Sequence, residues 1–216
     1  MRRITIITGH YGSGKSEFSV NLAILKKVDM VIDLDIVNPY FRSRETEMVL
    51  MKHNIRMISS GLKNALGSDL PFISGEVFLP FQDESKTAII DLGGDSIGAR
   101  LVRQFSDMMN NKEIDFLMCV NIYREATSTV DGIMKMARQI EGSSGLRITG
   151  LINNSNFLRE TCCEDVRTGA LVVAEAAHKM GLPILYTGIY EKIVKECKGL
   201  AGEIIPLTLY LRKNWL

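Results

Sequence analysis

The chain alternates between short runs of apolar and β-branched residues and longer segments in which apolar positions recur every three or four residues. After residue 129, for example, apolar side chains fall at Val130, Ile133, Met134, Ala137 and Ile140, which is typical of one face of an amphipathic helix. Runs without polar alternation indicate strands that are buried on both faces. We expect such strands at Ile4–Thr8, Val28–Leu34, Ile55–Ser59, Thr87–Leu92, Phe116–Ile122, Arg147–Ile152 and Ile184–Thr187.

Strands separated by helices predict a mainly parallel sheet with right-handed crossovers, and therefore a doubly wound α/β fold. The 216 residues suit a single domain over 1–216, with 199–216 as a closing strand or docked tail. A membrane contact by the last residues, Leu-Arg-Lys-Asn-Trp-Leu, is the alternative for that tail. The irregular segment Ser60–Phe81 is either a lid or a plain connection, with a short helix after Ser74.

Composition limits the partners. The net charge is +1 and charged residues are 24% of the chain, so no basic field indicates a nucleic-acid partner. No apolar run approaches the length of a bilayer span, and the start lacks a signal peptide's apolar region, so we expect no integral membrane association and a cytoplasmic location.

The four cysteines form no Cys-x-x-Cys pair and no cluster typical of zinc. Neighbouring Cys162 and Cys163 are a candidate redox device, but we expect all four cysteines to be reduced thiols.

The stretch Ile4–Ala23 joins a predicted strand, a glycine-rich bend and a predicted helix. Within it, Gly9 is followed after four residues by Gly14, Lys15 and Ser16, which is the spacing of a phosphate-binding loop. Glycines let consecutive backbone N–H groups surround a phosphate at the start of a helix. The predicted fold is therefore of the P-loop NTPase type.

The chemistry of the loop assigns roles to its residues. Lys15 should reach the β- and γ-phosphates and act in catalysis, and the Ser16 hydroxyl should bind Mg²⁺. The His10 side chain either touches phosphate oxygens or points to solvent. The nucleotide-binding residues expected from this stretch are Gly9, His10, Tyr11, Gly12, Ser13, Gly14, Lys15, Ser16 and Glu17.

Polar residues follow the other predicted strands at the edge where ligands bind in such sheets. Asp33 and Asp35 end the second strand, and we choose Asp35 as the carboxylate that orients or deprotonates water and helps to hold the metal. Asp91 ends the fourth strand, where a carboxylate would hold the water shell of Mg²⁺. Gly94 follows and should bring its backbone N–H to the γ-phosphate, so that this segment acts as a switch.

Asn153 and Asn154 follow the sixth strand and are candidates for contacts to a purine base, or simply for turn residues. An Asn-Lys-x-Asp motif selective for guanine is missing, which favours adenine. Arg124 follows the fifth strand, as a phosphate or partner contact or as a solvated charge. Residues 40–44 form either a recognition surface or a helix start.

In motif order from Ile4 to about Thr187, the chain resembles the MinD/ParA/CobQ family of P-loop proteins, in the SIMIBI class. The motifs are Gly-His-Tyr-Gly-Ser-Gly-Lys-Ser, Asp-Leu-Asp with Asn-Pro, Ile-Ile-Asp-Leu-Gly-Gly and Leu-Ile-Asn-Asn. The resemblance implies ATP binding, slow hydrolysis and often nucleotide-driven dimerisation, with Asp35 activating water, Asp91 beside the metal and Asn153 at adenine. The family's early-loop lysine is replaced by His10, which is shorter and carries no fixed positive charge. Tyr11 stands where the family has Gly.

We therefore expect a Mg²⁺-dependent ATP-binding protein that acts as a slow ATPase and nucleotide-driven switch, with a protein partner of unknown identity or a second copy of itself. Two alternatives remain open at this stage because a P-loop supports all three functions. One is an ATP-dependent phosphotransferase or synthetase acting on a small metabolite. The other is a nucleotide sensor without catalysis.

Overall fold

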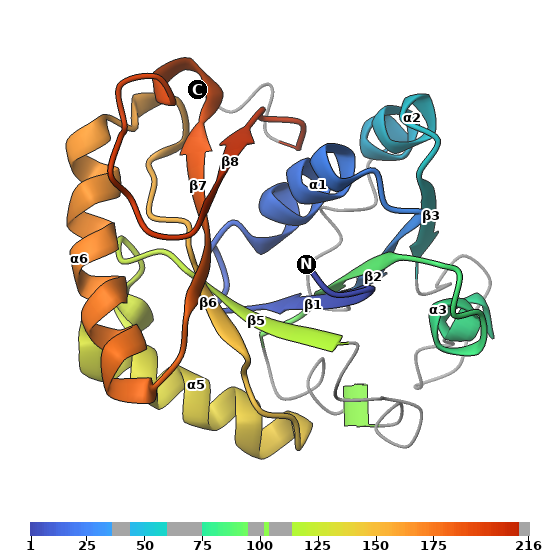
Figure 1. Ribbon diagram of the computed structural model, residues 1–216, viewed down its shortest axis with the longest axis horizontal. Coiled ribbons are helices and arrows are strands. Elements are labelled where there is room, and N and C mark those ends of the chain that lie inside the picture. Colours follow the sequence, from blue (N-terminus) through green and yellow to red (C-terminus); the bar gives the residue numbers. More distant parts are fainter. Residues whose placement is uncertain (36–43, 60–74, 95–101, 104–113, 212–216) are drawn as a thin grey trace, which may run out of the picture.

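The computed structural model describes residues 1–35, 44–59, 75–94, 102–103 and 114–211. Its strands form one eight-stranded sheet in which all neighbours are parallel, in the order β3-β2-β4-β1-β5-β6-β7-β8 (Figure 1). The strands are β1 (Ile4–Thr8), β2 (Met30–Leu34), β3 (Arg56–Ser59), β4 (Ala88–Leu92), β5 (Ile114–Val120), β6 (Gly150–Asn153), β7 (Ile184–Tyr190) and β8 (Glu203–Leu207).

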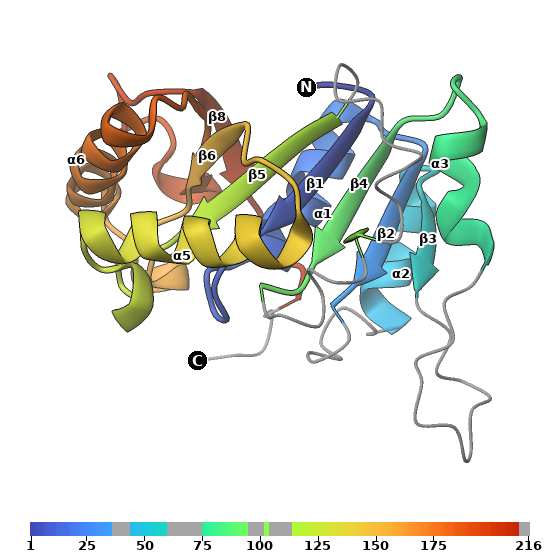
Figure 2. The same ribbon diagram turned by 90° about the horizontal axis from the view of Figure 1, so that it is seen from below.

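Helices connect the strands and cover both faces of the sheet (Figures 1 and 2). The α-helices are α1 (Lys15–Lys26), α2 (Arg44–Lys52), α3 (Leu79–Gln82), α5 (Val130–Ser144) and α6 (Cys163–Met180). Short 3₁₀ helices are η3 (Gly75–Phe78), η5 (Glu125–Thr127), η6 (Leu158–Glu160) and η7 (Glu191–Ile193).

Two apolar clusters on opposite faces explain this layering. On one face, Phe18 and Leu22 of α1 and Leu50 of α2 pack against alternate strand residues. On the other face, Ile133 of α5 and Val173 of α6 pack against the remaining strand residues. The inner strands β1, β2, β4, β5 and β6 thus bury both of their faces, which is why they appear as mainly apolar runs in the sequence, whereas the edge strands β3 and β8 have exposed residues. The predicted doubly wound α/β fold is confirmed.

The boundaries of β5 differ from the prediction at both ends. The strand begins two residues earlier than expected, at Ile114, and ends at Val120. Asp115 interrupts the apolar pattern, but its carboxylate is satisfied by the backbone N–H of Arg2 at 2.8 Å. A polar residue can therefore continue the strand because a partner from another segment bonds it.

The chain beyond residue 199 includes the predicted closing strand, β8, which pairs with β7. Asn21 of α1 then bonds both backbone groups of Thr208, donating to its carbonyl and accepting from its N–H, each at 2.9 Å. The predicted helix after Ser74 is present as η3 followed by α3. Residues 60–74 and 212–216 lie outside the described part of the chain.

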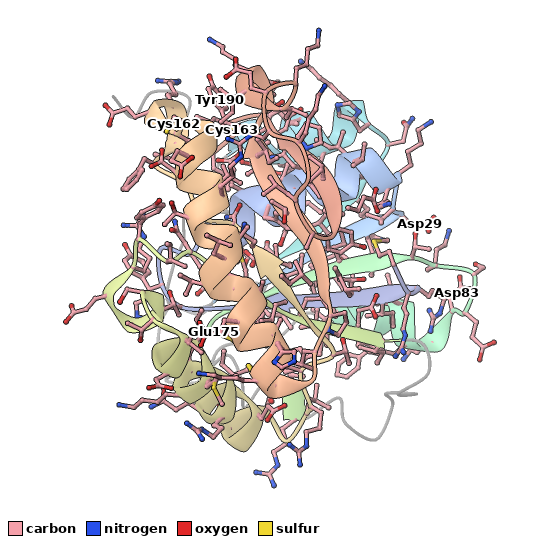
Figure 3. All side chains as sticks on the ribbon, turned by 60° about the vertical axis from the view of Figure 1, so that its left-hand side comes forward. Asp29, Asp83, Cys162, Cys163, Glu175 and Tyr190 are labelled. Atoms are coloured by element: carbon pink, nitrogen blue, oxygen red, sulfur yellow. A yellow bond between two sulfur atoms is a disulfide. The ribbon has the colours of Figure 1, made fainter. Side chains whose placement is uncertain are left out.

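The cysteine prediction was wrong for two residues. Cys163, the first residue of α6, forms a disulfide with Cys197, which follows η7, and their Cα atoms are 5.4 Å apart. Cys119 and Cys162 are free thiols, and Cys162 adjoins Cys163 at the start of α6 (Figure 3). The partners are separated by 34 residues, so only the fold brings them together.

Candidate functional site

The loop between β1 and α1 is shaped by glycines that have no space for a side chain. A Cβ on Gly9 would lie 2.4 Å from the carbonyl oxygen of Cys119, and one on Gly14 would lie 2.4 Å from the Asn154 amide nitrogen. Gly14 also has a left-handed backbone, with φ of 83°, as the N-cap of α1. The loop therefore delivers the first turn of α1, with its unpaired N–H groups, to the carboxyl edge of the sheet.

Lys15 and Asp35 form a buried ion pair across this edge. Their side chains are 7% and 3% exposed, and the Lys15 ammonium bonds the Asp35 carboxylate. Burial opposes the charge of Lys15, but the nearby carboxylates of Asp91 and Asp35 outweigh it and raise the lysine's pKa. Lys15 is thus held fully charged at the loop.

Ser16 and Asp91 form the second polar pair of the site. The Ser16 hydroxyl donates to one Asp91 oxygen at 2.5 Å. Burial raises the pKa of Asp91 to about 6; Lys15 and the Ser16 hydrogen bond work against this shift, and Asp35 adds to it. Burial disfavours the charged form of this carboxyl group, and a positively charged ligand at the site would offset that penalty.

The donor set fits Mg²⁺ bound in the usual way for a P-loop. The second Asp91 oxygen is buried and has no hydrogen-bond partner among the described residues. Within those residues, no group of three or more His, Cys, Asp or Glu side chains forms a metal site of its own. Ser16 would thus be a direct ligand and Asp91 would bond the ion's water, because Mg²⁺ keeps several waters and phosphate ligands.

Further buried polar atoms without a partner in the described chain lie around the same loop. They are Thr8 Oγ1, His10 Nδ1, Ser13 Oγ and Asn154 Oδ1. Since buried polar groups are nearly always bonded, their concentration at one place indicates a site that a polar ligand or water completes.

Gly94 lies directly on the phosphate-binding loop. A Cβ there would be 1.9 Å from the Gly9 carbonyl oxygen and 3.3 Å from the His10 nitrogen. The chain after β4 and the loop after β1 are therefore in contact at the backbone. Residues 95–101, the rest of the predicted switch, are outside the described residues, as are Asn38, Pro39 and the other residues of 36–43.

The two predicted base-contacting asparagines are held by protein groups. Asn153 is fully buried, with its amide nitrogen 3.4 Å from the Val166 carbonyl and its oxygen accepting from the Ser155 N–H. Asn154 donates to the Ser13 carbonyl at 2.8 Å and so fastens the loop to β6. Their contact with adenine stays a prediction, and the fastening role of Asn154 is one that the sequence did not indicate.

The Glu17 side chain bonds a distant part of the chain, and its predicted nucleotide contact stays a prediction. Its carboxylate accepts from the backbone N–H groups of Tyr210, at 2.6 Å, and Leu211, at 3.2 Å. The side chain therefore holds the C-terminal segment against α1. Only the Glu17 backbone N–H, in the first turn of α1, is placed to face a ligand at the loop.

Arg124 and Cys119 contact the loop from other parts of the chain, and His10 and Tyr11 belong to the loop itself. Arg124 donates from Nε to the Gly12 carbonyl at 2.8 Å. His10 is partly buried, whereas Tyr11 is 64% exposed. Burial raises the pKa of Cys119 to about 12, so this thiol beneath the loop stays neutral and serves packing.

The sheet order and the loop define an α/β fold of the P-loop NTPase type. Among solved structures, the chain is similar to FtsY from Mycoplasma mycoides, with a TM-score of 0.59 and 15% identity over 94% of this chain and 65% of that chain. It is also similar to FtsY from Elizabethkingia anophelis, with a TM-score of 0.55 and 15% identity over 96% and 62%. A structure of the latter in complex with GDP matches with a TM-score of 0.52 and 14% identity over 89% and 58%.

The chain thus spans about three fifths of the length of these FtsY proteins. No protein-family model matches the sequence, and the search of curated proteins found no match. Among the described residues, no helix combines the length and the apolar character needed to cross a membrane.

Proposed function

We propose that the protein binds Mg–ATP at the loop from Gly9 to Ser16 and works as a slow ATPase and nucleotide-driven switch. The observation that carries the proposal is the pairing of Lys15 with Asp35 and of Ser16 with Asp91 at one edge of the sheet. Both partners of each pair are groups that a Mg-bound triphosphate needs.

Ligand binding would exchange partners within the site. The phosphates take the Lys15 ammonium from Asp35, and the freed carboxylate then orients the attacking water. Ser16 and Asp91 would hold the metal, which would supply positive charge to offset that of the phosphates. The Gly94 contact with Gly9 carries the state of the loop to the chain that follows β4.

ATP is preferred over GTP because the chain after β6 reads Asn153-Asn154-Ser155-Asn156, without the acidic residue that would bond the guanine edge. The GDP complex of FtsY makes GTP the necessary comparison. The resemblance to the MinD/ParA family adds a second copy of the chain as a proposed partner in the ATP-bound state.

A sensor without catalysis is the second candidate. It is favoured by the engagement of Asp35 with Lys15, since a carboxylate that stays paired cannot orient water. The two candidates differ in whether Asp35 is released when the nucleotide binds.

Phosphate release from ATP and from GTP, with and without Mg²⁺, tests the proposal. Wild type should release phosphate slowly from ATP, and Lys15→Ala and Asp35→Asn should not. Asp91→Asn should weaken the Mg²⁺ dependence of binding. Tight binding with no release supports the sensor, release only with an added metabolite supports a phosphotransferase or synthetase, and equal rates in wild type and Lys15→Ala contradict the ATPase.

A further inference from the structure

Arg124 lies against the phosphate-binding loop, although it belongs to the connection between β5 and α5. Its Nε donates to the Gly12 carbonyl at 2.8 Å. A Cβ on Gly12 would lie 3.0 Å from Arg124 Nε, 3.4 Å from Cδ and 3.5 Å from Cζ. The guanidinium group is therefore in direct contact with the backbone in the middle of the loop.

The turn that carries Arg124 is well fixed. The Arg124 N–H donates to the Asn121 carbonyl at 3.1 Å, and the Thr127 hydroxyl donates to the same carbonyl at 2.8 Å. The preceding Tyr123 packs its ring on Phe157, with centroids 4.0 Å apart. A side chain that starts from such a turn is positioned before any ligand arrives.

Arg124 keeps most of its hydrogen-bonding capacity unused. The bond to Gly12 uses Nε, and within the described chain no carboxylate forms an ion pair with this residue. The two terminal nitrogens carry the remaining donors of a planar fork that matches phosphate geometry. A partly buried cation without a counter-charge at an anion-binding loop is available for an anionic ligand.

The charges of the site favour an additional cation near the loop. Lys15 is the cation inside the loop, and it lies near both Asp35 and Asp91, which offset its charge. His10 stands early in the loop, and between Gly9 and Ser16 the sequence has no arginine and no lysine other than Lys15. A triphosphate therefore needs a further positive group, and Arg124 is in contact with the same loop.

We propose that Arg124 is a second phosphate-binding residue, supplied by the same chain, whose Nε holds Gly12 while its terminal nitrogens contact the phosphate groups of the nucleoside triphosphate. This inference rests on the proposed nucleotide binding and adds a residue to that site. Arg124 supplies from within one chain a positive charge that the His10 position lacks.

Titration calorimetry with Mg–ATP separates charge from loop positioning. Arg124→Gln keeps an N–H donor for Gly12 but removes the charge, and it should weaken binding by about 10- to 100-fold, as for loss of a charged hydrogen bond. Arg124→Lys keeps the charge and should bind within about 5-fold of wild type, since lysine also serves as a phosphate contact. Arg147→Gln makes the same charge change at a side chain that is 90% exposed at the opposite edge, and should bind as wild type does.

A second measurement does not depend on variants that fold. Phenylglyoxal modifies accessible arginine side chains, and mass spectrometry locates the product. Mg–ATP should protect Arg124 in the wild-type chain and leave Arg147 modified to the same extent.

The outcomes are distinct. A larger loss in Arg124→Lys than in Arg124→Gln would assign the residue to positioning of the loop through the Gly12 bond and overturn the phosphate contact. If Arg124→Gln binds Mg–ATP as tightly as wild type, or if Mg–ATP does not protect Arg124 from modification, this inference is overturned and the proposed function still stands. Absence of any nucleotide binding by wild type would overturn the proposed function, and this inference with it.

Discussion

Lys15 is 6% exposed and shares its charge with two carboxylates, those of Asp35 and Asp91. Water solvates the charge of an exposed lysine, but a buried ammonium group loses that solvation and requires a charged partner. The pairing therefore satisfies the buried charge within the fold, and under the proposed function the same cation would bind a phosphate.

Removal of the Lys15 charge should destabilise the chain in the absence of nucleotide. Lys15→Met leaves Asp35 buried without its cation, which costs about 3–5 kcal/mol in the free energy of unfolding for a buried pair. The double change Lys15→Met with Asp35→Asn should recover much of that loss. Urea unfolding of the four combinations measures the coupling between the two residues.

The pair of Lys26 with Glu203 provides the matched control. It likewise joins a lysine to a carboxylate, at 2.7 Å, but the side chains are 26% and 48% exposed. Lys26→Met should cost less than about 1 kcal/mol, as exposed ion pairs do. If Lys15→Met lowers the free energy of unfolding no more than Lys26→Met does, the buried pair of Lys15 with Asp35 does not stabilise the fold more than an exposed pair.

At the scale of elements, the site is made where separate connections meet at the carboxyl ends of parallel strands. The loop after β1 contacts the chain after β4 through Gly94 and the chain after β6 through Asn154. In both contacts the loop takes part through its backbone carbonyl groups. The sheet therefore sets the distance between these connections, and glycine at position 94 allows the close approach.

Gly94→Ala should disturb the loop although it adds a single methyl group. The added Cβ would lie 1.9 Å from the Gly9 carbonyl oxygen, and because backbone is on both sides, one connection must move. We expect Mg–ATP affinity to fall more than about 10-fold, as when positioning groups shift. Calorimetry measures this directly.

Gly142→Ala is the control for Gly94→Ala. Gly142 lies in α5, and no atom of the described residues beyond its chain neighbours and the backbone of the surrounding helix lies within 4 Å of an added Cβ. Alanine should therefore stabilise the helix by about 0.5–1 kcal/mol and leave binding unchanged. If both alanine variants bind Mg–ATP as wild type does, the contact of Gly94 with the loop is not needed for binding.

The amino ends of β2 and β4 are tied by Asp29 and Thr87. The Asp29 carboxylate accepts from the Thr87 N–H and hydroxyl, both at 2.8 Å, and these bonds lower the pKa of Asp29 from 3.8, with the backbone hydrogen bond as the largest cause. A carboxylate with a lowered native pKa stabilises the fold above its unfolded pKa, and the contribution is lost as the pH falls through the native pKa.

Asp29→Asn should therefore destabilise the chain at pH 7 and much less at about pH 3. The difference in unfolding free energy at pH 7 should stay below about 1 kcal/mol, because the group is 37% exposed. Glu84→Gln, which changes an exposed carboxylate, should follow wild type at both pH values. A difference between Asp29→Asn and wild type that does not change with pH would contradict this account of the tie.

The strands and the loop could be predicted from sequence because both depend on local information. Strands buried on both faces appear as apolar runs, and the spacing from Gly9 to Ser16 is contiguous. The boundaries of β5 could not, since Asp115 belongs to the strand only through its bond with Arg2.

Contacts between distant residues were beyond the reach of sequence patterns. The side chain of Glu17 bonds Tyr210 and Leu211, a contact that the loop pattern does not indicate. Asn154 also fastens Ser13, while its contact with a base stays a prediction. These partners are separated by 141 or more residues, so only the packing of the sheet and α1 could identify them.

At the scale of the whole molecule, the Cys163–Cys197 disulfide connects the start of α6 with the chain between η7 and β8. It closes a loop that contains β7, a strand paired on both sides. A cross-link over this separation reduces the conformational freedom of the unfolded chain.

Reduction of the disulfide should lower the free energy of unfolding by about 2–4 kcal/mol, the range for a loop of this size. Urea unfolding with and without dithiothreitol measures the difference, and Cys163→Ser with Cys197→Ser should reproduce the reduced value. The experiment uses a Cys162→Ser background, because the exposed Cys162 thiol beside the bond would otherwise exchange with it. Equal stability with and without reductant would contradict the disulfide.

The central claim is that the loop from Gly9 to Ser16 binds a Mg-bound nucleoside triphosphate. Titration calorimetry of wild type with ATP in the presence of Mg²⁺ tests it most directly, with GTP and a Mg²⁺-free titration for comparison. We predict heat that saturates at one ATP per chain, a raised melting temperature and weaker binding without Mg²⁺. No heat and no thermal shift with either nucleotide at millimolar concentration would contradict the account.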